Sequence, residues 1–354
     1  MGIGKFYPRR AVENLIVNPQ TLIAQEGTSF SAMSSGDYVV DGFKYLKSGS
    51  MVHTGTQSTD NPAASGRLYH GYRSVKLDCT TADASIAAGD YCALVSYVEG
   101  FDALRCYEVP FVMTFWHKHT KTGTYCVAIT NSGSDRTIVK EYTQAVADTW
   151  EKTTLIFEAS PSAGTWDQTN GVGFRIAFAL ACGSTYQTTA DAWNTGNYFG
   201  TSNQVNACDA TSNYFILTDV ALYPGSRDLG FFAPLYVDQL NRCQRYYEKT
   251  YDIGTNPGSV TAGGSIQELS RDTSLLYSGS QQFKERKRTA PTVTLYEIFG
   301  TSGQVSVYTT GDSYSSSVSA SADYVSDFSY RLNGGGNLTA DRVIKYHHVA
   351  DARF

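Results

Sequence analysis

Charged residues are scarce in this sequence, and long apolar runs are missing. Asp, Glu, Lys and Arg make up only 17% of the 354 residues, and no stretch reaches the ~18 consecutive apolar residues that a membrane-spanning helix requires. The net charge is −5, and no stripe of Lys and Arg provides the positive surface on which nucleic-acid binders depend. We therefore expect neither membrane insertion nor a nucleic-acid partner.

Cysteine is present, but its spacing does not indicate a set of disulfides or a metal site. The seven cysteines form no CxxC pair and follow no regular spacing, so we expect free thiols that pack like small apolar residues in a reducing compartment. The first residues contain no apolar segment of signal-peptide length before a cleavage site. These features predict a protein that folds in a cytoplasm.

Catalytic motifs are also missing. The chain has no Gly-x-Ser-x-Gly elbow, phosphate loop or HExxH. Glycoside hydrolysis needs two carboxylates about 5 to 10 Å apart, whereas Asp and Glu are scattered singly here, and the repeats of a β-helix are absent. An enzyme is not expected.

Aromatic residues and glycine are abundant, with 25 Tyr and 32 Gly, and 42% of residues are hydrophobic. Residues 172–182 alternate between a wholly apolar set and a set of small residues with one arginine. This pattern indicates a strand with one face in a core and another face small enough to be covered by a neighbour. A single sheet would leave the apolar face in water, so we expect two facing antiparallel sheets, a jelly roll.

The remaining chain divides around one charged, tyrosine-rich stretch. From Pro234, apolar positions follow at helical spacing to about residue 251, while Arg242, Arg245, Glu248 and Lys249 fall on the opposite side. We predict one helix of three to four turns. Behind it, residues 253–354 read as a smaller β domain with weak strands, too thin to be stable without help, which predicts homo-oligomerisation.

Several motifs carry a resemblance to a known family. These are NLIVNPQTLIAQEGTSF at residues 14–30, CQRYYEK at residues 243–249 and ADARF at residues 350–354. The chain resembles tailed-bacteriophage tail-fibre and virion-appendage proteins that carry a carbohydrate-binding-module-like jelly roll and a CQRYYEK linker helix. The chain departs from the family in having Glu26 where Arg is more common, and Pro19 in place of Gly.

The resemblance implies a domain order and a place of action. It implies a particle-anchoring segment (1–30), a jelly roll (31–230), a linker helix (231–252) and a C-terminal β domain (253–354). The chain would be a virion protein, assembled in the bacterial host cytoplasm as a homotrimer beside other tail or capsid proteins. It would be a short fibre that adheres to a host-surface glycan, or a purely architectural capsid decoration, head fibre or tail connector. A polysaccharide depolymerase is the less favoured alternative.

Exposed aromatic rings on loops are the candidates for glycan contact, because sugars stack their C–H faces on them. The candidates are Trp166, Tyr186, Trp193, Tyr198 and Phe199. The competing interpretation is that these rings plug the open end of the sandwich.

Other candidate residues concern metals and contacts. No cofactor is expected apart from a calcium ion at Asp219, with Asp41 and Asp78 as companions. His117 and His119 share a strand face, which we interpret as a solvated edge rather than a metal site. The residues expected at an interdomain or intersubunit interface are Arg245, Tyr246, Tyr247 and Tyr251, and those expected to anchor the chain to the particle are Phe6, Tyr7, Arg9 and Arg10.

Overall fold

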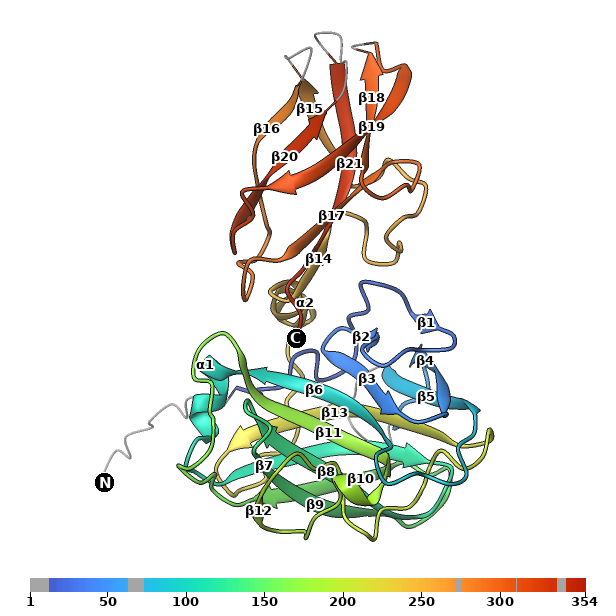
Figure 1. Ribbon diagram of the computed structural model, residues 1–354, viewed down its shortest axis with the longest axis vertical. Coiled ribbons are helices and arrows are strands. Elements are labelled where there is room, and N and C mark those ends of the chain that lie inside the picture. The colour runs from blue at the N-terminus through green and yellow to red at the C-terminus, as the bar shows by residue number, and fades with distance from the viewer. Residues whose placement is uncertain (1–12, 63–72, 271–274, 310, 336–341) are drawn as a thin grey trace, which may run out of the picture.

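The computed structural model describes residues 13–62, 73–270, 275–309, 311–335 and 342–354. Figure 1 shows a β sandwich below and a smaller β domain above, with the C-terminus returning to the waist between them. The anchor candidates Phe6, Tyr7, Arg9 and Arg10 lie outside the described residues. No helix in the described part of the chain is long and apolar enough to cross a membrane.

The sandwich consists of two antiparallel sheets and is the jelly roll that the alternation predicts. The six-stranded sheet has the order β1 (Ser29–Phe30), β4 (Val52–Ser58), β5 (Ser74–Thr81), β13 (Tyr214–Pro224), β7 (Phe111–His119) and β10 (Glu151–Phe157). The seven-stranded sheet has the order β12 (Trp193–Thr195), β9 (Arg136–Gln144), β8 (Gly123–Asn131), β11 (Val172–Cys182), β6 (Tyr91–Glu99), β3 (Phe43–Ser48) and β2 (Tyr38–Val40).

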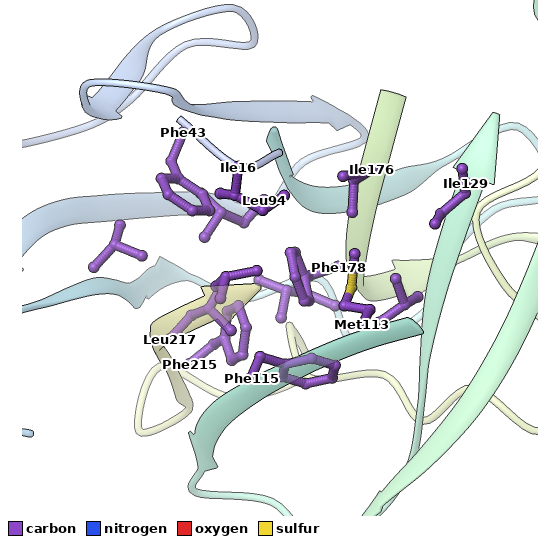
Figure 2. Close-up of a cluster of buried hydrophobic side chains, with 14 of the residues drawn as sticks. Ile16, Phe43, Leu94, Met113, Phe115, Ile129, Ile176, Phe178, Phe215 and Leu217 are labelled. Carbon is purple, nitrogen blue, oxygen red and sulfur yellow. The ribbon is translucent and has the colours of Figure 1, made fainter. Parts of the chain in front are cut away.

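The core lies between these sheets, as Figure 2 shows. Phe174, Ile176 and Phe178 of β11 are at most 1% exposed, and the ring of Phe178 lies 5.1 Å from that of Phe115 on the opposite sheet. Each such side chain stabilises the fold by roughly 1.5–3 kcal/mol through removal of apolar area from water.

The outer face of the seven-stranded sheet is also buried. Ala177 and Ala179 of β11 have no exposed surface, and they form a second apolar cluster with Phe199. The chain between β11 and β13, which includes η2 (Ser184–Tyr186), therefore packs on this face. The prediction that the small face of residues 172–182 is covered by a neighbour is confirmed.

The sandwich starts earlier than residue 31. Leu15 and Ile16 are 3% and 0% exposed and belong to the main core, and the Leu15 amide donates to the Leu222 carbonyl at 3.1 Å. Residues 14–30 are thus part of the jelly roll rather than a separate segment.

The linker helix is shorter than predicted. α2 spans Tyr236–Gln244, and Tyr247–Lys249 form strand β14, which pairs with residues 349–351 of β21 (Arg342–Asp351). Strand pairing satisfies the backbone groups of residues 247–249, and this tertiary contact overrides the helical spacing.

The C-terminal domain consists of antiparallel strands around its own core. The sheet order is β14, β21, β18 (Gln304–Thr309), β19 (Tyr314–Asp323), β20 (Ser329–Gly335) and β16 (Leu275–Gln282), with β15 (Ile266–Ser270) and β17 (Thr292–Glu297) also pairing with β21. In the serine-rich strand β19, Val318, Ala320 and Ala322 alternate toward the core.

Candidate functional site

Three aromatic rings meet at the rim of the sandwich. Tyr107 follows η1 (Leu104–Cys106), Trp166 lies in the loop between β10 and β11, and Trp193 begins β12. The ring centroid of Trp166 is 5.6 Å from that of Tyr107 and 5.5 Å from that of Trp193, both edge to face. All three side chains are half-buried, so each ring is fixed by packing while part of it faces solvent. We call Tyr107, Trp166 and Trp193 the rim platform.

Hydrogen bonds hold the platform loops in place. Asp135 accepts hydrogen bonds from the Thr165 amide at 3.2 Å and from Asn131 Nδ2 at 2.6 Å. The Asn131 contact and the Thr165 amide lower the pKa of Asp135, so this carboxylate stays ionised and keeps the loop pinned. Trp193 Nε1 donates to the Glu158 carbonyl at 3.1 Å. A platform held in this way loses little entropy when it binds a ligand.

Charged groups border the platform at Trp193. Lys140 Nζ lies 2.9 Å from a carboxylate oxygen of both Glu158 and Asp191. The lysine side chain is only 11% exposed, whereas those of Glu158 and Asp191 are 54% and 71% exposed. In this cluster beside Trp193, the groups that face solvent are therefore the two carboxylates, which accept hydrogen bonds.

The other three aromatic candidates lie elsewhere, on the outer face of the seven-stranded sheet. Phe199 is only 1% exposed and stacks on Tyr91 at 4.4 Å, with the Arg175 guanidinium 4.6 Å from its centroid. Tyr186 contacts the same ring edge to face at 5.6 Å. Tyr198 is half-buried and donates its hydroxyl to the Thr195 carbonyl at 3.0 Å.

The five aromatic candidates thus divide. Trp166 and Trp193 share the rim platform, whereas Phe199 is a packing residue that cannot stack on a ligand. Phe199 therefore fits the plug interpretation, although what it covers is a sheet face rather than the open end of the sandwich.

The proposed calcium companions do not come together around Asp219. Asp219 is 1% exposed. Asp41 accepts hydrogen bonds from the Gln25 amide at 2.9 Å and from Gln25 Nε2 at 2.6 Å, and Asp78 pairs with Lys76 at 2.6 Å. In the described residues, the one group of three or more ligand side chains with converging atoms contains none of these aspartates.

His117 and His119 are buried in the core, so the solvated-edge interpretation was wrong. His117 contacts Gln144 Oε1 at 3.0 Å and Thr153 Oγ1 at 2.9 Å. His119 stacks on Tyr125 with ring centroids 3.7 Å apart. Strand β7 extends to His119, and its alternate side chains, including both histidines, point into the core. Tyr142 and Tyr125 pack against the two imidazole rings there, where we had expected solvent.

The candidate interface residues join the two domains within this chain. Arg245 Nη2 pairs with Glu99 of the sandwich at 2.5 Å, and Tyr246 Oη donates to the same carboxylate at 2.9 Å. The Tyr247 carbonyl accepts a hydrogen bond from Gln25 at 2.7 Å. Tyr251, which is 2% exposed, stacks on His347 at 3.8 Å in the upper domain. We call Glu99, Arg245 and Tyr246 the junction triad.

Two further ion pairs lie near the junction, one within the C-terminal domain and one between the two domains. Glu248 and Lys287 lie 2.6 Å apart with side chains at most 2% exposed, so Glu248 is buried in an ion pair although it was expected on the side of the helix opposite the apolar residues. Burial would raise the pKa of Glu248, but His348 at 3.6 Å, the Lys287 ammonium and the Lys284 amide together lower it to about 2. We attribute the lowering mainly to Lys287, because 3.6 Å is too long for a strong hydrogen bond. Glu26 pairs with Arg353 at 2.5 Å.

The sequence reasoning missed Tyr107 and Lys140 as site residues. Tyr107 lies about 60 residues from Trp166 in sequence, and no pattern links a loop tyrosine to a distant tryptophan. Lys140 lies within a strand, where the alternation of side chains predicts the sheet face it occupies but not the loop residues it contacts.

Comparisons with known proteins give structural similarities alone. No protein-family model and no curated protein matches the chain. The chain is similar to the enzymatically active domain of tailspike protein 4 of bacteriophage CBA120 (14% identity, TM-score 0.30), with 55% of this chain and 21% of that chain covered.

Two carbohydrate-binding modules are similar along nearly their whole length. One is TmCBM61 in complex with β-1,4-galactotriose (11% identity, TM-score 0.31, 60% of this chain and 99% of that one). The other is a family 11 module from Clostridium thermocellum in complex with a β-1,3-1,4-mixed-linked tetrasaccharide (12% identity, TM-score 0.28, 56% and 97%). Similarities of this size transfer no ligand and no activity to this chain.

Proposed function

We propose that this chain is a non-enzymatic structural protein of a tailed-bacteriophage particle and that its jelly roll adheres to a host-surface glycan. The phage assignment is supported by the motifs at residues 14–30, 243–249 and 350–354. The adhesive role is supported by the rim platform.

The observation that carries the adhesive role is the set of Tyr107, Trp166 and Trp193 on preorganised loops. Sugars offer flat C–H faces to aromatic rings and hydroxyl groups to polar neighbours. Because the exposed neighbours Glu158 and Asp191 are carboxylates, they accept hydrogen bonds from hydroxyl groups and repel anionic sugars. The proposed ligand is therefore a neutral oligosaccharide.

A glycan array with the purified full-length protein tests this function. Binding to neutral oligosaccharides, with little binding to sulfated or uronic-acid glycans, supports the proposal. An array without a bound glycan at high protein concentration, or one dominated by anionic glycans, contradicts it.

Attachment to the particle remains assigned to the N-terminal residues Phe6, Tyr7, Arg9 and Arg10. Asn14 already belongs to the sandwich, since its Nδ2 donates to the Val220 carbonyl at 2.9 Å. Deleting residues 2–12 should therefore leave the fold intact and release the protein from virions. Retention of the truncated protein on particles argues against this anchor.

A second candidate function is architectural, and one observation favours it. Phe232, Leu235, Tyr236 and Val237 are 66%, 70%, 51% and 54% exposed at the waist. Monomeric proteins rarely leave several large apolar side chains together in water. We propose that this waist patch holds copies of the chain together in a homotrimer, an arrangement that suits either a fibre or a decoration protein.

A further inference from the structure

The inside of the sandwich contains a cluster of soft metal ligands that the proposed function does not use. It consists of His53, Cys92 and Cys208, whose ligand atoms all lie within 4.8 Å of one another. All three residues are at most 2% exposed. They are far apart in sequence, so no motif spacing reveals them.

The three residues come from different parts of the sandwich. His53 lies on β4 in the six-stranded sheet, Cys92 lies on β6 in the seven-stranded sheet, and Cys208 lies in the chain that leads into β13. A shared ligand would therefore connect both sheets and this loop. Such a connection resembles a disulfide in effect, because it restricts elements that are distant along the chain.

The histidine is oriented toward the sulfur atoms. Its Nδ1 lies 2.7 Å from the Tyr45 hydroxyl, and its Nε2 lies 3.9 Å from the Cys208 sulfur. When Nδ1 carries the proton and donates to the Tyr45 oxygen, the lone pair of Nε2 points toward Cys208. Outer contacts of this kind commonly fix the ring of a metal-binding histidine.

A fourth sulfur stands beside the cluster. Cys79 on β5 is the direct cross-strand partner of His53, and the ladder register shifts between Val52 and His53. Directly opposite residues place their Cβ atoms about 4.5–5.5 Å apart. Cys79 is 2% exposed, and its sulfur lies 3.8 Å from the Cys208 carbonyl oxygen.

We propose that His53, Cys92 and Cys208 bind one zinc ion inside the jelly roll, with Cys79 as the fourth ligand. Tetrahedral zinc holds sulfur at about 2.3 Å and nitrogen at about 2.0–2.1 Å, which separates its ligand atoms by roughly 3.5–3.8 Å. The three converging atoms, which all lie within 4.8 Å of one another, must close by at most about 1.3 Å to reach that spacing. The Cys79 sulfur is 3.3 Å from the Thr81 carbonyl oxygen and must turn toward them to complete the site. Binding releases three thiol protons to solvent, and the three thiolates together with Zn²⁺ leave one net negative charge on the site.

The test is metal analysis of the full-length protein, expressed with zinc in the medium and purified without chelator or immobilised metal. We expect about one zinc per chain, and replacement by cobalt should produce the near-ultraviolet thiolate-to-metal charge-transfer band. Cys208→Ser and Cys92→Ser should each lose most of the bound metal. The matched control is Cys126→Ser. Cys126 is as buried as Cys92 and lies in the same seven-stranded sheet, but on its outer face, so this variant should retain the ion.

Because a core variant can fail to fold, the wild-type protein is also tested directly. A mercurial reagent that modifies thiols should release one equivalent of zinc, measured with a metal indicator dye. Wild-type protein without stoichiometric zinc overturns the proposal. A metal-free protein whose measured mass is two hydrogens below that of the reduced chain contains a disulfide and also overturns the proposal. Equal zinc content in the Cys126→Ser and Cys208→Ser variants does the same.

Discussion

Glu99, the last residue of β6, accepts two hydrogen bonds from Arg245 of the junction, with Nε–Oε2 at 2.8 Å and Nη2–Oε1 at 2.5 Å. The glutamate side chain is 3% exposed and that of the arginine is 33% exposed. Parallel hydrogen bonds between a guanidinium and a carboxylate fix distance and orientation together. The sandwich and the C-terminal domain are therefore held in one arrangement rather than linked loosely.

Replacing Glu99 by Ala should separate the domains. The change leaves the Arg245 charge partly buried without its partner, so we expect the free energy of unfolding to fall by about 3 kcal/mol and calorimetry to resolve two transitions. The control is Asp327→Ala, which breaks the exposed Arg286–Asp327 pair at 2.9 Å and should cost at most about 1 kcal/mol. Equal effects of the two changes would contradict the role of the junction triad.

Acid should destabilise the protein through its buried histidines. Burial lowers the pKa of His117 from 6.5 to about 4. Between pH 6.5 and pH 4, His117 binds a proton in the unfolded chain but stays neutral in the folded chain. The free energy of unfolding therefore falls as the pH drops through this window, by roughly 3 kcal/mol for this residue.

His117→Gln tests this pH dependence, because glutamine does not titrate and can still hydrogen-bond to Thr153. Urea unfolding between pH 7 and pH 4 should show a slope shallower by about one proton in the variant. An unchanged slope would mean that His117 is not the group that titrates.

The contrast between Phe199 and the rim platform gives a third prediction. Phe199→Ala removes a buried ring from between Tyr91 and Arg175, so we expect a loss of about 3–5 kcal/mol of stability. At a temperature where the variant is folded, its glycan affinity should equal that of the wild type. A stable variant that no longer binds glycan would place Phe199 in the ligand site instead.

The waist patch predicts the state of assembly. Leu235→Asp places a charge on a side chain that is 70% exposed in one chain, so the monomer fold should be unaffected while a trimer dissociates. Val260→Asp is the matched control, because Val260 is 74% exposed but lies in the loop before β15. Sedimentation velocity should show a trimer for the wild type and for Val260→Asp, and a smaller species for Leu235→Asp. A wild-type protein that is monomeric at micromolar concentration refutes the patch as an interface.

Alternation along the strands was enough to predict the sandwich, because a two-residue period determines which side chains enter a core. Residues 172–182 correspond to β11 with the expected buried face. The same reasoning failed where distant contacts decide the structure. Residues 247–249 have helical spacing but pair with β21 as a strand.

The candidate site was predicted in part, for a similar reason. Composition singles out Trp166 and Trp193 as loop aromatics, but only the fold brings Tyr107 beside them and encloses Phe199. The cluster of His53, Cys92 and Cys208 could not be predicted from the sequence either, because its members are separated by more than 30 residues.

The most direct test of the account compares glycan affinity in two tryptophan variants. Trp193 belongs to the rim platform, whereas Trp150 is a half-buried tryptophan whose Nε1 bonds Asp60 at 2.9 Å, away from the platform. Using a neutral oligosaccharide selected from the array, calorimetric titration should show at least about tenfold weaker binding for Trp193→Ala and wild-type binding for Trp150→Ala, with both variants folded by circular dichroism. Equal affinity of the wild type and Trp193→Ala would contradict the proposed adhesive function.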